Sequence, residues 1–121
     1  MRQKYLVPVV FAASFLGTVA FADWKQVTTE EGYISAFVGK NTVDADGNTY
    51  RHSADGTFTG KLKSGDKLRG AWQWRGKYWC RNAIIGDREL GTDCQKVEVD
   101  GNKWRITREK GKGRSVFGTT K

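Results

Sequence analysis

The chain has 121 residues and a formal net charge of +8, from 21 Lys and Arg side chains against 13 Asp and Glu. If residues 1–22 are removed as a leader, the remaining 99 residues are enough for one small domain and too few for two. One histidine and two cysteines, with no Cys-x-x-Cys, argue against a structural zinc site, which needs about four nitrogen or sulfur ligands. No cofactor motif occurs either, so we expect no metal and no cofactor.

Residues 1–22 have the layout of a bacterial Sec-type signal peptide. Two basic residues precede an apolar run over residues 5–16, and Ala20-Phe21-Ala22 places small residues at the two positions that a signal peptidase reads. An uncleaved membrane anchor is the competing interpretation, but the apolar run is short for one. We therefore expect cleavage after Ala22 and one mature β domain, residues 23–121, in the periplasm or secreted.

A short helix is expected near the start of the mature domain. Thr28 is its predicted N-cap, and Glu31, three residues later, completes a capping box. Ile34 and Phe37 recur at helical spacing, and Gly39 ends the segment. The apolar side of this helix should cover one end or side of a sheet.

After the helix the sequence alternates apolar and polar residues, the pattern of half-buried strands. Turn signals such as Asp46-Gly47, Asp55-Gly56 and Ser64-Gly65 recur at the spacing of hairpins. Sequential hairpins leave two long edges unless the sheet closes, so we predict a mainly β fold, a small antiparallel up-and-down barrel or strongly curled meander. The predicted strands are 41–43, 49–52, 57–63, 67–75, 78–82, 95–99, 103–107 and 115–119.

Cys80 and Cys94 are the only cysteines, and in an oxidising compartment such a pair predicts a disulfide. Closing a loop of this length would stabilise the fold by roughly 3 kcal/mol. We expect residues 81–93 to form a long loop. That loop would serve either as a contact surface, as in small secreted inhibitors, or as a plug of the barrel through Ile84 and Ile85.

Aromatic side chains are concentrated around residues 70–81. Trp72, Trp74 and Trp104 fall on inward-facing strand positions and are expected to fill the core. Tyr78 and Trp79 point to opposite faces, so one of the two is expected to be exposed and able to stack on a ligand. The alternation does not say which.

Positive charge gathers in the second part of the mature domain, because residues 23–55 carry −3 and residues 56–121 carry +9. This asymmetry indicates a basic surface and an acidic partner. Like charges facing each other destabilise a sheet, and an anionic ligand would offset that cost, although a solvated, salt-screened face is the alternative. The candidate anion-binding residues are Lys61, Lys63, Lys67, Arg69, Arg75, Lys103 and Arg105.

These features predict a binding module whose partner is an anionic glycan, a lipid headgroup or an acidic protein, with nucleic acid less favoured. The alternative is an inhibitor or protein-interaction domain that acts through the segment between Cys80 and Cys94. Catalysis has little support and we expect no enzyme. His52 is the only histidine, and its neighbours Ser53 and Asp55 lie in a turn-like segment, where such residues bond the backbone.

Three segments together resemble a known group: Gly70-Ala71-Trp72-Gln73-Trp74, Trp79-Cys80-Arg81 and Gly91-Thr92-Asp93-Cys94-Gln95. They resemble small exported proteins of marine and soil alphaproteobacteria that share G-x-W-x-W, C-R, D/N-C-Q and a later G-x-G, here Gly111-Lys112-Gly113. The resemblance implies export and no established activity. Some members carry the label dihydrodipicolinate reductase. That activity requires a dinucleotide-binding βαβ unit and a second domain, which a 99-residue domain with one predicted helix lacks.

Overall fold

A computed structural model describes residues 22–121 of the chain. The predicted signal peptide therefore lies outside the described residues, apart from Ala22. Within residues 22–121, no helix has both the length and the apolar character needed to cross a bilayer.

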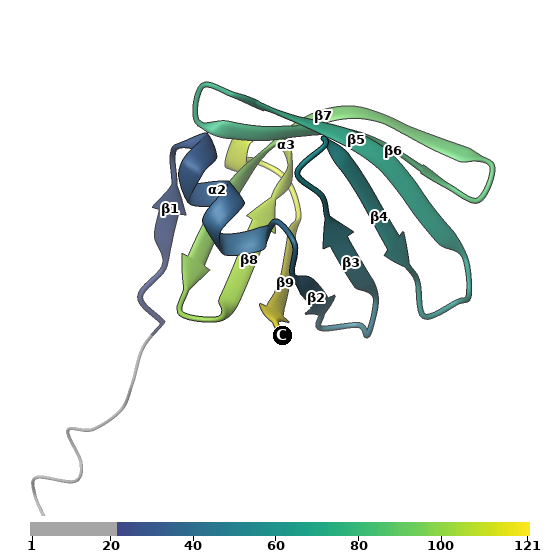
Figure 1. The fold of residues 1–121 in the computed structure, drawn as a ribbon, viewed down its shortest axis with the longest axis horizontal. Coiled ribbons are helices and arrows are strands. Elements are labelled where there is room, and N and C mark those ends of the chain that lie inside the picture. The colour runs from purple at the N-terminus through teal and green to yellow at the C-terminus, as the bar shows by residue number, and fades with distance from the viewer. Residues whose placement is uncertain (1–21) are drawn as a thin grey trace, which may run out of the picture.

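The described part of the chain is mainly β, with strands that follow one another in short hairpins (Figure 1). The elements are β1 (Lys25–Val27), α2 (Glu30–Phe37), β2 (Asn41–Asp44), β3 (Thr49–His52), β4 (Thr57–Lys61), β5 (Lys67–Arg75), β6 (Tyr78–Ile85), β7 (Arg88–Asp100), β8 (Lys103–Thr107), α3 (Arg108–Gly111) and β9 (Ser115–Thr120).

Eight of these strands form a closed antiparallel barrel, which confirms the predicted fold class. From β2 to β9 each strand pairs with the next, and β9 returns to pair with β2. The short β1 pairs with residues 97–99 of β7, while β8 occupies the other edge of β7. An open sheet of these hairpins would have two long unpaired edges, and closure of the barrel leaves most strand edges paired.

The strands predicted from the alternation of apolar and polar residues agree well with those in the structure. The bounds of β3, β5 and β8 are those predicted, and the other predicted strands each overlap one in the structure. The helix begins later than predicted, because Thr29 and not Thr28 is the N-cap, its hydroxyl accepting from Gly32 N at 3.1 Å. Neither β1 nor α3 was predicted. In α3, Glu109 and Lys110 adopt left-handed backbone angles. Residues other than glycine rarely adopt these angles, so the sequence did not indicate this turn.

The prediction of a long loop between the cysteines was wrong. Residues 81–93 are the arms of the β6–β7 hairpin, closed by a two-residue turn at Gly86-Asp87. Gly86 has a φ of 58°, which suits the first central position of a tight hairpin turn. Cys80 and Cys94 pair directly across the two strands and form the predicted disulfide, so the bond ties the hairpin together at its base.

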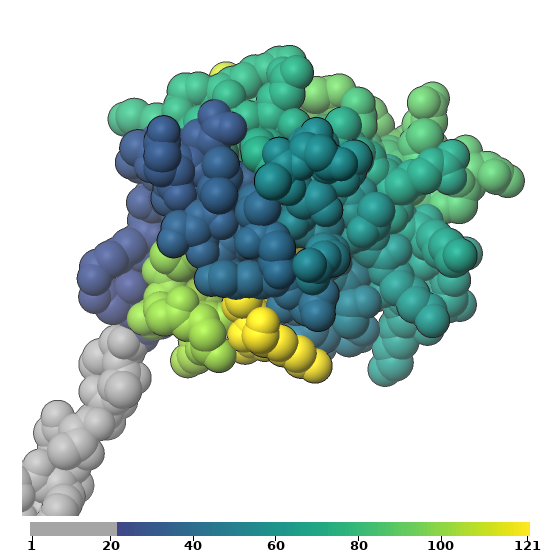
Figure 2. Space-filling view, viewed as in Figure 1, coloured from purple at the N-terminus to yellow at the C-terminus, as the bar shows by residue number. Residues whose placement is uncertain are grey.

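Inward-facing aromatic side chains fill the end of the barrel that α2 covers. The α2 segment packs over the strands and forms part of the molecular surface in Figure 2. From it, Tyr33 and Phe37 are fully buried, and the Tyr33 ring meets Trp72 edge-on with centroids 4.8 Å apart. Trp72 and Trp104 are buried and Trp74 packs against the same cluster, which confirms their predicted core positions.

Inward-facing glycines make room for these rings. Gly118 of β9 lies against the indole of Trp104, and a Cβ at this position would overlap both that ring and the carbonyl of Val43. Gly60 of β4 similarly faces the ring of Tyr50. Small and large side chains thus alternate around the interior, as small barrels require.

Candidate anion-binding face

Two rows of basic side chains run across the outside of β3, β4 and β5. In one row Lys61 lies directly opposite Lys67, and in the next row Thr59 lies between Arg51 and Arg69. Adjacent strands are about 4.8 Å apart and successive residues on one face about 7 Å apart, so these four cations start from backbone positions within roughly 12 Å. We call Arg51, Lys61, Lys67 and Arg69 the basic face.

The basic face has no internal counter-charge. All four side chains are exposed, and among the described residues none of them lies within 4.0 Å of a carboxylate. Arg51 donates through Nη1 to Asn41 Oδ1 at 2.9 Å, a neutral partner. A shallow groove of about 550 Å³ is lined by Arg51, Lys61 and Lys67, together with Lys121. Facing like charges destabilise the sheet, so an anion placed there would relieve a cost that the folded protein carries.

Hydroxyl and amide groups lie between these cations. Thr49 and Thr59 share the two rows, and Asn41 lines the same groove. The large hydrophobic side chains exposed on the described part of the chain are Ile34 of α2 and Phe117 of β9, which lie elsewhere. The basic face is therefore a charged and hydrogen-bonding surface without an aromatic platform.

Sequence reasoning found three of the four members and missed Arg51. Arg51 follows the same alternation as its neighbours in β3, since His52 and Tyr50 face inward and Thr49 and Arg51 outward. The alternation that marks Arg51 as outward-facing was present, but it lay in residues 23–55, where the net charge is negative. Pairing of β3 with β4 places this single arginine among the lysines.

Two other predicted residues lie near the ends of β4 and β5. Lys63 is in the turn between these strands, where its backbone N donates to Asn48 Oδ1 at 2.8 Å. Arg75 is at the far end of β5, and its Nε and Nη2 both donate to Gln73 Oε1. Lys63 can extend the basic face, whereas Arg75 is six residues along the strand from Arg69.

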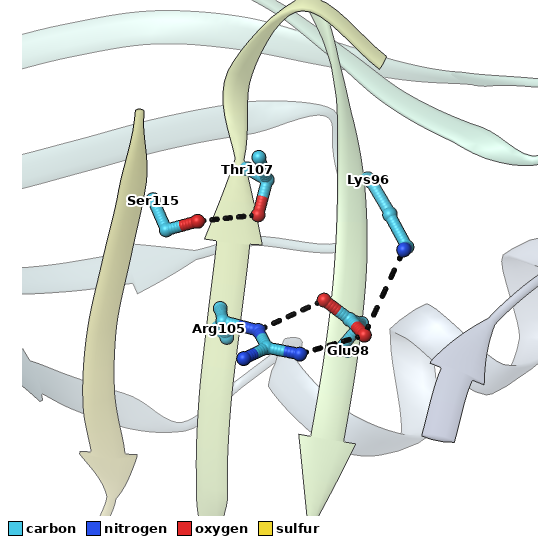
Figure 3. A network of polar contacts seen from close by, with 5 residues as sticks. All are labelled: Lys96, Glu98, Arg105, Thr107 and Ser115. Carbon is cyan, nitrogen blue, oxygen red and sulfur yellow. Dashed lines mark hydrogen bonds and ion pairs between the residues drawn. The ribbon is translucent and has the colours of Figure 1, made fainter. Parts of the chain in front are cut away.

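Lys103 and Arg105 do not join the basic face, because β8 lies on the opposite side of the barrel from β4. Arg105 is already paired: its Nε and Nη2 each donate to a Glu98 oxygen at 2.9 Å, and Lys96 lies 3.8 Å from the same carboxylate (Figure 3). Hydrogen bonds from Arg105 hold the pKa of Glu98 below its ordinary value. The charge of Arg105 is therefore already compensated by Glu98.

The two ligand-stacking candidates have different positions. Trp79 is only 2% exposed and faces the barrel interior, so it cannot stack on a ligand outside the barrel. Tyr78 is half-buried on the outside, with the Nζ of Lys110 5.5 Å from its ring centroid. Tyr78 therefore remains the stacking candidate, although it lies apart from the basic face.

His52 is buried in the aromatic core. Its Nδ1 lies 2.5 Å from the hydroxyl of Tyr33, and burial lowers its pKa to about 3. Asp55 instead accepts from the backbone and hydroxyl of Thr57, and the carbonyl of Ser53 accepts from the indole of Trp72. Each of the three residues that the sequence placed together thus has a structural partner of its own.

No protein-family model, no curated protein and no solved structure matches this chain. The resemblance to small exported alphaproteobacterial proteins is therefore a prediction from the sequence motifs alone.

Proposed function

We propose that this protein is an exported binding domain that holds an anionic polysaccharide against the outside of its barrel. The observation that carries the proposal is the pair of cationic rows on β3, β4 and β5, which have no carboxylate partner among residues 22–121. The signal-peptide pattern and the disulfide support export, since disulfides persist in oxidising compartments.

A polysaccharide suits this surface better than a nucleic acid or a lipid headgroup does. Threonine and asparagine side chains between the cations can bond sugar hydroxyls. Binding of single-stranded nucleic acid relies on aromatic rings that stack on the bases, and the described basic face exposes none. A lipid surface favours apolar side chains that enter the bilayer, and the exposed Ile34 and Phe117 lie on other elements.

The test measures binding of the mature domain, residues 23–121, to heparin as a sulfated-polysaccharide probe across a NaCl gradient. Binding should weaken steeply with salt, because each neutralised charge releases counterions. In the variant K61Q/K67Q the slope of log affinity against log salt should fall by about two. The control K77Q/K112Q removes the same charge from exposed positions off the basic face and should retain most of the slope.

Equal losses in K61Q/K67Q and in K77Q/K112Q would show that net charge, and not this surface, governs binding. Binding that does not depend on salt, or no binding at about 50 mM NaCl, would also contradict the proposal.

A second candidate function is protein recognition through the β6–β7 hairpin. Residues 88–95 of β7 pair with β6 but not with β8, which begins its pairing at Lys96, so within the described chain this edge has no second strand. Arg88 is exposed beside the turn and the disulfide holds the hairpin rigid, whereas Leu90 packs inward. Substitution of Arg88 by alanine should abolish capture of a protein partner without unfolding the domain.

A further inference from the structure

The barrel interior is not filled at the end away from α2. A cavity of about 490 Å³ enters there, and Leu62, Leu68, Ile85 and Val116 line it. This volume falls in the range of small-molecule sites, roughly 300–1,000 Å³. Eight-stranded barrels are wide enough to enclose one small ligand.

A buried arginine lines this cavity. Arg81 is on the inner face of β6, four residues deeper than Ile85, and is 7% exposed. Its Nη1 donates to the carbonyl of Gly91 at 3.2 Å, and among the described residues this is its one hydrogen bond. A guanidinium has five N–H donors, and a buried cation without an anionic partner is costly.

The neighbouring carboxylate does not supply that partner. Asp93 lies opposite Arg81 in the β6–β7 register, yet its oxygens lie more than 4.0 Å from the guanidinium. Asp93 instead accepts from Gln95 Nε2 at 2.8 Å and from Glu109 N at 3.3 Å, and it lies 3.6 Å from Arg108 Nε. Burial, and next the nearby Arg108, lower the pKa of Arg81, and the charge of Asp93 offsets these two effects only in part.

The other charged groups of the cavity do not cancel this potential. Asp44 lines it, but its carboxylate accepts four hydrogen bonds, from Asp46 N, from the backbone and side chain of Asn48, and from the hydroxyl of Tyr50. Asp46 is exposed at the opening, where Arg108 and Arg114 also lie.

One indole N–H donor is also unpaired at the cavity. Trp104 lines it, and its Nε1 is buried without a hydrogen-bond partner in residues 22–121. Native proteins leave few buried donors unpaired. The interior therefore offers donors and a cation, but no free acceptor of equal strength.

We propose that the barrel interior binds one small amphipathic carboxylate, with its carboxylate on the Arg81 guanidinium and its apolar body among Leu62, Leu68 and Ile85. A guanidinium binds a carboxylate through two parallel hydrogen bonds, which would give Arg81 the anionic partner that it lacks. Because Arg81 lies deeper than the apolar side chains, the carboxylate enters first and the apolar tail points to the opening. This site is separate from the basic face, which lies on the outside of the barrel.

The experiment titrates the mature domain with decanoate, and separately with decanol, which has the same tail without the carboxylate. Tryptophan fluorescence reports affinity, and amide and arginine side-chain NMR shifts report location. We expect decanoate to bind at least tenfold more tightly than decanol and to shift the signals of Arg81 and Gly91. In R81M, decanoate should lose at least tenfold in affinity while decanol is unchanged. R81M should fold, because methionine removes a buried unpaired charge and fills the same space with an unbranched apolar side chain.

The matched control is R69M, which removes one arginine from the basic face and should leave decanoate binding unchanged. Equal affinities for decanoate and decanol, an unchanged decanoate affinity in R81M, or the same loss in R69M would overturn the proposal. So would the absence of any response to decanoate at millimolar concentration. Should R81M not fold, the shift of the Arg81 side-chain signal in the unmodified domain, present with decanoate and absent with decanol, still decides the question.

Discussion

Two buried polar side chains of this barrel, His52 and Asp44, are satisfied by hydrogen bonds, one from a distant partner and the other from its neighbours in the sequence. His52 of β3 and Tyr33 of α2 share a hydrogen bond in the core. Burial alone would raise the pKa of Asp44, but its four hydrogen bonds bring that pKa below the ordinary value. These two residues respond to pH in the same direction, because each folded-state pKa is lower than the unfolded one.

The lowered pKa of His52 makes stability depend on pH. The imidazole has a pKa of about 6.5 when unfolded and about 3 when folded, so below pH 6.5 the unfolded chain binds a proton that the folded protein does not. Stability is therefore lost as the pH falls. Between pH 7 and pH 5 we expect the free energy of unfolding to fall by about 2 kcal/mol, as measured by urea denaturation.

The variant H52Q isolates this effect, because glutamine keeps an acceptor for Tyr33 and does not titrate. Its stability should be nearly flat between pH 7 and pH 5, because His52 is the only histidine of the chain. In the unmodified domain, NMR signals of the His52 ring should not titrate above about pH 4. A ring titration near pH 6.5 would contradict the prediction, because it would mean that the imidazole is solvated and not buried in the aromatic core.

At the scale of elements, the sequence predicted what alternation alone determines. The inward and outward positions of β5, from Lys67 to Arg75, follow strictly from its residue pattern. The β6–β7 hairpin was predicted only in part, because Ile84-Ile85 breaks the alternation and a bulge at Leu90 shifts the register of β7. The short β1 depends on its tertiary contact with β7, which no local pattern encodes.

The disulfide makes a measurable contribution to this hairpin. Cys80 and Cys94 are 14 residues apart, and closing a loop of that length stabilises a fold by roughly 3 kcal/mol in the chain-entropy model. The variant C80A/C94A should remain folded, because the turn at Gly86-Asp87 sets the register independently, but its free energy of unfolding should fall by about 3 kcal/mol. Denaturation in urea, followed by circular dichroism, measures the difference.

Reduction of the unmodified domain should reproduce the shift, and a reducing agent should not affect C80A/C94A. Loss of the β spectrum on reduction would show that the hairpin register depends on the covalent bond. If reduction does not change the free energy of unfolding, strand pairing alone accounts for the stability of the hairpin.

At the scale of the whole molecule, the two proposed sites differ in how many of their residues could be predicted from the sequence. The lysines of the basic face were visible as outward positions of predicted strands, and only the pairing of β3 with β4 was needed to add Arg51. Arg81 was not predicted as a site residue, because an arginine next to a cysteine in a strand gives no sign of its burial. Barrel closure turns the Arg81 side chain inward and leaves Asp93 bonded to other groups.

The predicted cleavage site also has a consequence for the folded domain. The backbone N of Asp23 donates to Asp100 Oδ2 at 3.0 Å, beside the β7–β8 turn. Cleavage between Ala22 and Asp23 would convert this nitrogen into a charged α-amino group, so the amide hydrogen bond would become an ion pair. We expect intact-mass measurement of the protein from its native location to give a chain that begins at Asp23.

The variant D100N tests the ion pair in two forms of the domain. In the form that begins at Asp23, D100N should lower the free energy of unfolding by at most about 1 kcal/mol, the range of exposed pairs, and about 1 M salt should remove the difference. In a form that retains Ala22, the nitrogen at Asp23 is an uncharged amide and the effect should be smaller. An equal effect in both forms would mean that the contact is an ordinary hydrogen bond, and a native chain that begins elsewhere would contradict the cleavage site itself.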